Sequence, residues 1–157
     1  MTNIAAVSAF SREHEPLSQE QLMDLEAIKA LTHRYALSLD RFDIDGVVDV
    51  FASDCVFDAS PFGLPLMEGR AQIREFFEHN EQSMASQMHL FANHIIEFDG
   101  ADEAHGTNYL YEDGYTKEGN RITCLGINED RYVRAADGWR IAYRKIAPLV
   151  PPKLEGY

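Results

Sequence analysis

The second half of the chain constrains the fold most, because it alternates long segments that have few helix or strand breakers with tight turns. The four segments are residues 88–98, 104–115, 122–134 and 139–146. The runs between them are short and rich in Gly, Asp and Asn, as at residues 99–102. Such spacing is typical of antiparallel strands that follow one another through hairpin turns. We therefore predict a four-stranded meander.

Three helices are expected before this meander. Ser18, with a glutamine three residues later, forms a capping-box pattern, and apolar residues then recur at steps of three or four as far as Tyr35. This helix is predicted to end near Asp40. A shorter helix is expected after Asp43, then a short strand at Val56 and Phe57, and a third helix over residues 70–84. Helices followed by a meander indicate an α+β fold with the helices packed on one face of a curved sheet.

The length of 157 residues suggests a single domain with short extensions. Residues 1–17 show no sustained period and are interpreted as an N-terminal arm. Residues 18–147 form the predicted domain. Residues 148–157 contain three prolines and are expected to be an extended tail.

Charge and composition exclude several classes of partner. The net charge of −12 disfavours nucleic acid and anionic membrane surfaces, which both require clustered Lys and Arg. The sequence holds no apolar run of 18 residues, and its first residues lack the basic region of a signal peptide. Cys55 and Cys124 show no CxxC spacing and are interpreted as reduced thiols in a cytoplasmic protein. A small hydrophobic molecule remains the expected partner.

No motif for a metal or a cofactor is found. The sequence has no HxH or HExxH motif, no Cys/His cluster, no glycine-rich phosphate loop and no GxSxG motif. We therefore expect any chemistry to depend on side chains alone, without a metal or a cofactor.

The order of elements resembles the SnoaL-like group of the nuclear-transport-factor-two-like superfamily. The resemblance covers roughly residues 20–147 and rests on the segments RYALSLDRFDIDGVVDVFASDCVFD, EGRAQIREFF, MHLFANHIIEFDGADEAHG and EDRYVRAADGWRIAYRKI. It implies a cone-shaped α+β barrel with an apolar cavity at its open mouth, assembled as a homodimer or homotrimer. Within this superfamily the chain is similar to a dehydratase-like branch that includes scytalone dehydratase, bile-acid 7α-dehydratase and hexachlorocyclohexane dehydrochlorinase.

The resemblance also implies candidate catalytic residues. Enzymes of this branch pair an aspartate at the end of the first helix with a histidine at the start of the first long strand, and Asp40 and His89 occupy those positions. Tyr35 matches the tyrosine that the bile-acid enzyme has five residues before its aspartate. Arg144 is the loose match to a basic residue that helps the leaving group depart. Tyr35 and Asp40 are about 140° apart on an ideal helix, so we expect them to converge only if the helix ends before Asp40.

The pattern of the chain suggests an aromatic pocket around these residues. Period-two alternation places Asn93 on the same strand face as His89, with Phe91 between them. The predicted pocket residues are Arg144, Asn93, Phe57, Phe91, Phe62 and Met67.

The predicted function is that of a small cofactor-independent lyase, a dehydratase, or an isomerase acting on a cyclic, steroid-like or polyketide-like substrate. His89 would be the general base and Asp40 would orient it. Two alternatives stay open. One is a non-catalytic binding or accessory subunit on the same fold. The other is an isomerase that uses a carboxylate base, which needs Asp58 or Glu112 inside the cavity and His89 elsewhere.

Overall fold

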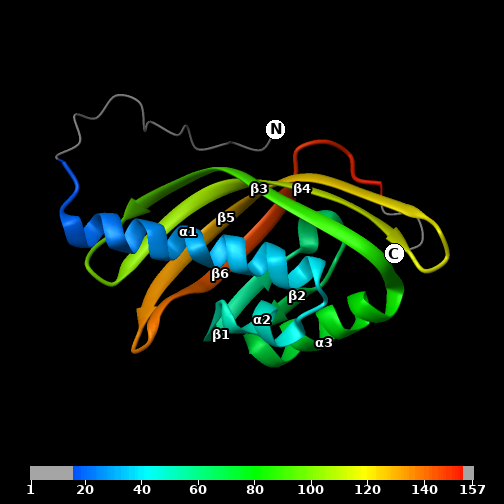
Figure 1. The fold of residues 1–157 in the computed structure, drawn as a ribbon, viewed down its shortest axis with the longest axis horizontal. Coiled ribbons are helices and arrows are strands. Elements are labelled where there is room, and N and C mark those ends of the chain that lie inside the picture. Colours follow the sequence, from blue (N-terminus) through cyan, green and yellow to red (C-terminus); the bar gives the residue numbers. More distant parts are fainter. Residues whose placement is uncertain (1–15, 154–157) are drawn as a thin grey trace.

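A computed structural model of the protein describes residues 16–153, in which three α-helices are combined with a six-stranded sheet (Figure 1). Most of the predicted N-terminal arm and the last four residues of the predicted tail lie outside the described residues. The elements in chain order are α1 (Gln19–Asp40), α2 (Ile44–Asp49), β1 (Phe51–Asp58), the 3₁₀ helix η1 (Ser60–Phe62), β2 (Leu66–Glu68), α3 (Gly69–Ser83), β3 (Met84–Phe98), β4 (Glu103–Thr116), β5 (Arg121–Ala135) and β6 (Gly138–Pro148).

Helix α1 begins at the predicted capping box. The Ser18 hydroxyl accepts a hydrogen bond from the Gln21 backbone N–H at 3.1 Å, and the Gln21 side chain accepts one from the Ser18 N–H at 2.9 Å. The buried face of α1 contains Ile28, Leu31, Tyr35 and Leu39. The helix continues as far as Asp40.

The sheet has the order β2-β1-β6-β5-β4-β3 and is curved but not closed. Strands β3 to β6 form the predicted antiparallel meander. The first half of the sheet was only partly predicted, because a strand of two residues was expected where β1 has eight. Strand β1 pairs in parallel with β6, and β2 adds an antiparallel edge.

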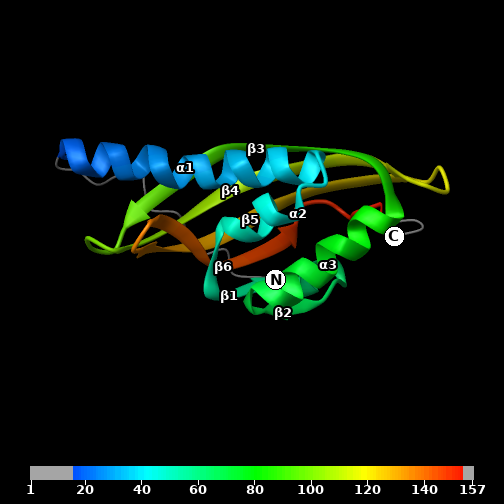
Figure 2. The ribbon, with the colours of Figure 1, turned by 60° about the horizontal axis from the view of Figure 1, so that its bottom comes forward.

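Among the described residues, the helices cover one face of this sheet, and no helix covers the other face, which is called the free face below (Figure 2). Helix α1 packs against β3 and β6, whereas α3 packs against β1 and β2. Side chains from the helices and from the covered face form one hydrophobic core, which includes Phe51, Phe57, Phe77 and Ile141. Among residues 16–153, no helix is both long and apolar enough to cross a membrane.

Candidate active site

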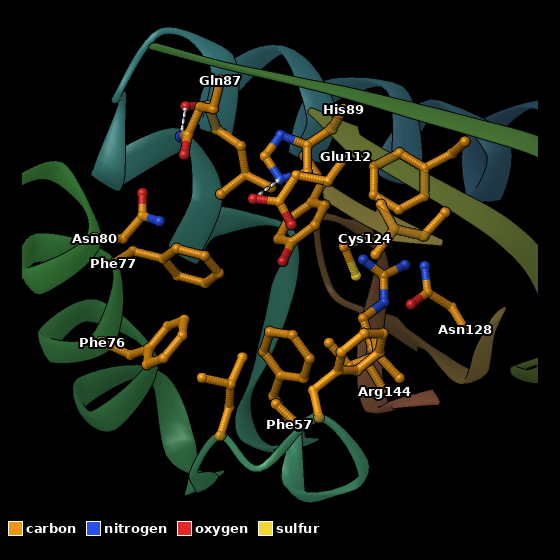
Figure 3. A pocket seen from close by; sticks show the side chains of 18 of the residues that line it. Phe57, Phe76, Phe77, Asn80, Gln87, His89, Glu112, Cys124, Asn128 and Arg144 are labelled. Atoms are coloured by element: carbon orange, nitrogen blue, oxygen red, sulfur yellow. Dashed lines mark hydrogen bonds and ion pairs between the residues drawn. The ribbon is translucent and has the colours of Figure 1, made fainter. Parts of the chain in front are cut away.

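A cavity lies between the covered face of the sheet, the C-terminal half of α1, helix α3 and the η1 segment (Figure 3). Most of its wall is apolar, from Tyr35, Leu39, Phe57, Phe62, Leu64, Phe76, Phe77, Phe91, Leu110, Ile122 and Ile146. A small set of polar side chains also faces the space, namely Asn80, Gln87, His89, Glu112, Asn128 and Arg144. An apolar cavity with a few convergent polar groups is the usual form of a small-molecule site.

His89 and Asp40 are in direct contact at the wall of this cavity. The His89 Nδ1 atom lies 2.8 Å from Asp40 Oδ1, and the His89 backbone N–H donates to the same oxygen at 2.9 Å. Only 8% of the His89 side chain and 26% of the Asp40 side chain is exposed. Two bonds from β3 thus hold the last residue of α1 in place.

The contact also removes the geometric difficulty raised by the sequence. Tyr35 lines the cavity, but Asp40 does not line it and reaches His89 from behind. The two α1 side chains therefore need not converge on one point, because His89 lies between Asp40 and the cavity. The helix can remain regular to its end.

The hydrogen bond to Asp40 assigns the two ring nitrogens different tasks. An ionised carboxylate can only accept hydrogen bonds, so Nδ1 carries the hydrogen and Nε2 is left with its lone pair. Nε2 faces the cavity side of the ring, where Glu112 lies. A second pair, His105 Nδ1 and Asp99 Oδ2, has the same 2.8 Å separation but joins the β3–β4 turn to the start of β4, with about half of each side chain exposed. Burial in a cavity wall, not the contact alone, distinguishes the His89 pair.

Glu112 is opposite His89 in the β3–β4 ladder and points into the same cavity. Its Oε1 lies 3.7 Å from His89 Nε2, and 16% of its side chain is exposed (Figure 3). The carboxylate-base alternative required Glu112 in the cavity without His89, and the structure places both residues there. Asp58, the other candidate for that alternative, does not line the cavity; its carboxylate accepts hydrogen bonds from Ser60.

Arg144 is fully buried and held by one carboxylate. Its Nε and Nη2 atoms donate to Asp130 at 2.8 and 2.7 Å, and both side chains are 0% exposed. Burial alone lowers the pKa of the guanidinium, but the Asp130 carboxylate more than offsets this, and the pKa stays above its ordinary value. The remaining Nη1 atom has no hydrogen-bond partner among the described residues. Arg144 lines the cavity and brings a permanent positive charge to its wall.

The Arg144–Asp130 pair belongs to a larger buried network. Asp130 Oδ2 also accepts from Tyr132 Oη at 2.8 Å and from Asn108 Nδ2 at 3.2 Å. His94 Nε2 lies 2.9 Å from Tyr132 Oη, and burial lowers the pKa of His94 to about 4. This network was not predicted from the sequence. Alternation along β5 does place Asp130 on the inward face, but nothing in the sequence alone shows which cation meets it.

Tyr35 lies at the centre of the aromatic wall. Its ring makes edge contacts with Phe51, Phe77 and Phe91 at centroid distances of 5.8, 6.1 and 5.8 Å, and the Arg144 guanidinium carbon lies 4.7 Å from its centroid. Burial raises the pKa of its phenol well above the usual value. The Tyr35 hydroxyl is therefore protonated at neutral pH and available as a hydrogen-bond donor.

The predicted pocket residues divide into two groups. Phe57, Phe62 and Phe91 line the cavity, but Met67 and Asn93 do not. Met67 is 2% exposed and packs in the core, opposite Phe57 in the β1–β2 ladder.

Asn93 is exposed and has a φ of 53°, at a point where the register of β3 with β4 shifts. This bulge breaks the period of two on which its predicted position depended.

Three amides in the cavity wall were not predicted from the sequence. Gln87 Nε2 donates to the Leu39 carbonyl at the end of α1 at 2.5 Å, while its Oε1 has no partner in the described part of the chain. Asn128 Nδ2 donates to Asn108 at 2.7 Å, and Asn128 Oδ1 is also without a partner there. Asn80 on α3 is the third. Buried polar atoms normally have hydrogen-bond partners, so the Gln87 and Asn128 oxygens are exceptions in the wall of this cavity.

Comparisons with known proteins agree with this architecture. A family model described as the SnoaL-like domain matches residues 20–145. A candidate aromatic ring hydroxylase from Novosphingobium aromaticivorans is 33% identical, with a TM-score of 0.82 over 86% of this chain and 96% of its own. No curated protein matches the chain.

Two further structures share the fold at lower identity. A candidate scytalone dehydratase from Novosphingobium aromaticivorans is 21% identical, with a TM-score of 0.79 over 85% of this chain and 89% of its own. A hexachlorocyclohexane dehydrochlorinase from Novosphingobium barchaimii is 16% identical, with a TM-score of 0.76 over 86% and 93%. At these identities the likeness establishes the fold alone.

Proposed function

The chain belongs to the SnoaL-like family, and on this premise we propose that it is a cofactor-independent lyase that removes water from a hydrophobic cyclic substrate. The substrate class that fits is a ring ketone with a hydroxyl group on the β carbon, as in polyketide-like or hydroxylated steroid-like molecules. The observation that carries the proposal is the Asp40–His89 pair, whose free ring nitrogen faces an aromatic cavity.

In the proposed reaction, His89 Nε2 removes a proton from the carbon beside the carbonyl. The electron pair of that C–H bond forms the new double bond, the β C–O bond breaks, and the hydroxyl leaves as water after it gains a proton. Asp40 keeps the imidazole in the required tautomer and stabilises its cationic form. Such positioned proton transfer typically contributes about 10²–10⁴-fold in rate.

Donors are needed where negative charge develops on the carbonyl oxygen. Tyr35 and Arg144 both line the cavity, and the Arg144 guanidinium lies over the Tyr35 ring within one aromatic cluster. Held rigidly and away from water, such donors stabilise an enolate oxygen more than solvent does. The aromatic side chains Phe57, Phe62 and Phe91 supply the surface on which a flat ring would pack.

The test uses purified protein and a panel of hydroxylated steroids and cyclic β-hydroxy ketones, with loss of water followed by mass spectrometry. His89→Gln is expected to lose at least about 10²-fold in rate. His105→Gln is the matched control, because it removes a histidine that is paired with an aspartate at the same distance outside the cavity. Equal rates in the wild type and His89→Gln would refute the base assignment. Tight binding of panel members without any turnover would favour a binding or accessory subunit.

We propose also that the protein forms a homodimer or homotrimer through the free face of its sheet. Apolar and aromatic side chains on that face are strongly exposed for a folded domain, including Met88, Leu90, Tyr109, Tyr115 and Leu125 at 41–54%. Size-exclusion chromatography with light scattering tests this, and Leu90→Glu should shift the assembly toward the monomer. A monomeric wild type would refute it.

A further inference from the structure

We propose that Glu112 is a second catalytic group of this site, an acid that gives the departing hydroxyl its proton. This inference rests on the proposed lyase function and deepens it. It divides the work between two residues: His89 takes the proton from carbon, and Glu112 supplies the proton to oxygen.

The geometry places Glu112 where one substrate oxygen can contact both residues. His89 Nε2 and Glu112 Oε1 are 3.7 Å apart, beyond hydrogen-bond length. Two atoms at this separation can each lie about 2.8 Å from a single oxygen between them, which is an ordinary hydrogen-bond length. A β-hydroxyl bound at that point would contact the carboxyl group of Glu112 and lie beside the ring that removes the neighbouring proton.

The surroundings of Glu112 also differ from those of a carboxylate in a structural ion pair. Among the described residues, its only ionic neighbour within 4 Å is the His89 ring, and no Lys or Arg neutralises it. The other ionisable groups of the cavity wall are Tyr35 on α1, Cys124 on β5 and Arg144 on β6, with Asp40 behind His89. A carboxyl group placed against apolar walls and a histidine is a typical proton-transfer group.

The proton balance closes within the pair. The proposed step starts with one proton on the Glu112 carboxyl group and none on His89 Nε2. His89 Nε2 takes the carbon-bound proton, and the Glu112 carboxyl gives its proton to the departing oxygen, which leaves as water. The cationic His89 then returns its proton to the Glu112 carboxylate across the short gap, so the enzyme regains its starting state.

The same geometry fixes the stereochemistry. His89 and Glu112 are paired positions on adjacent strands, so both side chains project from one face of the sheet. The proton and the hydroxyl must therefore leave from the same face of the substrate ring, which is a syn elimination.

The experiment compares two leaving groups on one ring. The probes are 3-hydroxy-1-tetralone and 3-chloro-1-tetralone, which both give 1-naphthol, the first by loss of water and the second by loss of chloride. Chloride needs no proton to depart. Glu112→Gln is expected to slow the hydroxy probe by about 10²-fold and the chloro probe by less than about threefold. His89→Gln is expected to slow both, since both require removal of the proton from carbon.

Two further variants serve as controls. Glu97→Gln makes the same substitution at an exposed position on β3 and should leave both rates unchanged. Glu112→Asp keeps an acid, so its rate on the hydroxy probe should be at least about tenfold higher than that of Glu112→Gln. Such a recovery would also show that the loss in Glu112→Gln does not come from misfolding.

Equal slowing of both probes in Glu112→Gln, with the wild type active, would overturn the Glu112 assignment and leave the lyase function standing. An anti elimination of a stereospecifically deuterated hydroxy probe would overturn it as well. A wild type that consumes neither probe would count against the lyase function itself, and the Glu112 assignment would fall with it.

Discussion

Replacement of Asp130 by asparagine gives the sharpest test of how the cavity wall is held together. In the native protein this carboxylate is the ionic partner of Arg144, and neither side chain is exposed to solvent. The substitution Asp130→Asn keeps the shape of the side chain but removes its charge, so the guanidinium stays buried without a counter-charge. Loss of one member of a buried ion pair typically costs about 3–5 kcal/mol. Total stabilities are about 5–15 kcal/mol, so a large share of the folding free energy should disappear.

The chain contains a matched control for this substitution. Arg121 and Asp113 form an ion pair with the same two-bond geometry, Nε to Oδ1 at 2.9 Å and Nη2 to Oδ2 at 2.6 Å. That pair is on the surface, where 57% of the Arg121 side chain is exposed. Solvent screens it, so Asp113→Asn should change stability far less than Asp130→Asn.

Urea unfolding followed by circular dichroism measures the difference, with the free energy taken from the midpoint and the slope. The double variant Asp130→Asn with Arg144→Met should recover at least half of the loss, because it removes the buried cation that lacks a partner. Similar destabilisation by Asp130→Asn and Asp113→Asn would refute the reasoning. So would a double variant no more stable than Asp130→Asn alone.

Three other outcomes follow from the same structure. The pKa of His94 is lower in the folded protein than in the unfolded chain, so stability should fall by up to about 3 kcal/mol as the pH drops from about 6.5 to about 4. In His94→Gln the urea midpoint should depend less on pH over that range, and a pH dependence equal to that of the wild type would contradict this. Gly126→Ala would place a Cβ 2.9 Å from a backbone oxygen and 3.1 Å from the Phe62 ring, so urea unfolding should show a free energy of unfolding lower by about 1–3 kcal/mol. A variant as stable as the wild type would contradict the close packing at this position. Asp40→Asn should reduce kcat by at least about tenfold with little change in KM, because it disturbs the tautomer of His89; a change confined to KM would contradict that role.

Most of the fold followed from local patterns in the sequence. The capping box at Ser18 and the hairpin turns of the meander depend on residues close together in the chain, and such signals are strong. The parallel pairing of β1 with β6 was not predicted, because it joins segments far apart in the chain, as in the pair Phe51 and Ile141. No tight turn connects these two strands, so the sequence carries no local signal for their pairing. Strand β2 has only three residues and carries no visible period.

The position of the candidate site was predictable in part, and the limits have physical causes. Residue type and the family pattern led to Asp40 and His89, whereas Asn93 was misplaced because a bulge in β3 ended the alternation. The closeness of Glu112 to His89 depends on the β3–β4 register, which the turn sequence alone left undetermined. The partner of Arg144 likewise depends on how β5 and β6 lie together.

The central claim is that His89, held by Asp40, removes a proton from carbon inside the cavity. The most direct measurement is deuterium incorporation beside the carbonyl of 1-tetralone in D₂O, followed by NMR, since this probe has no leaving group and reports proton removal alone. The wild type and His105→Gln should exchange that position at equal rates, and His89→Gln should be slower by at least about 10²-fold. Exchange by His89→Gln at the rate of the wild type would contradict the claim.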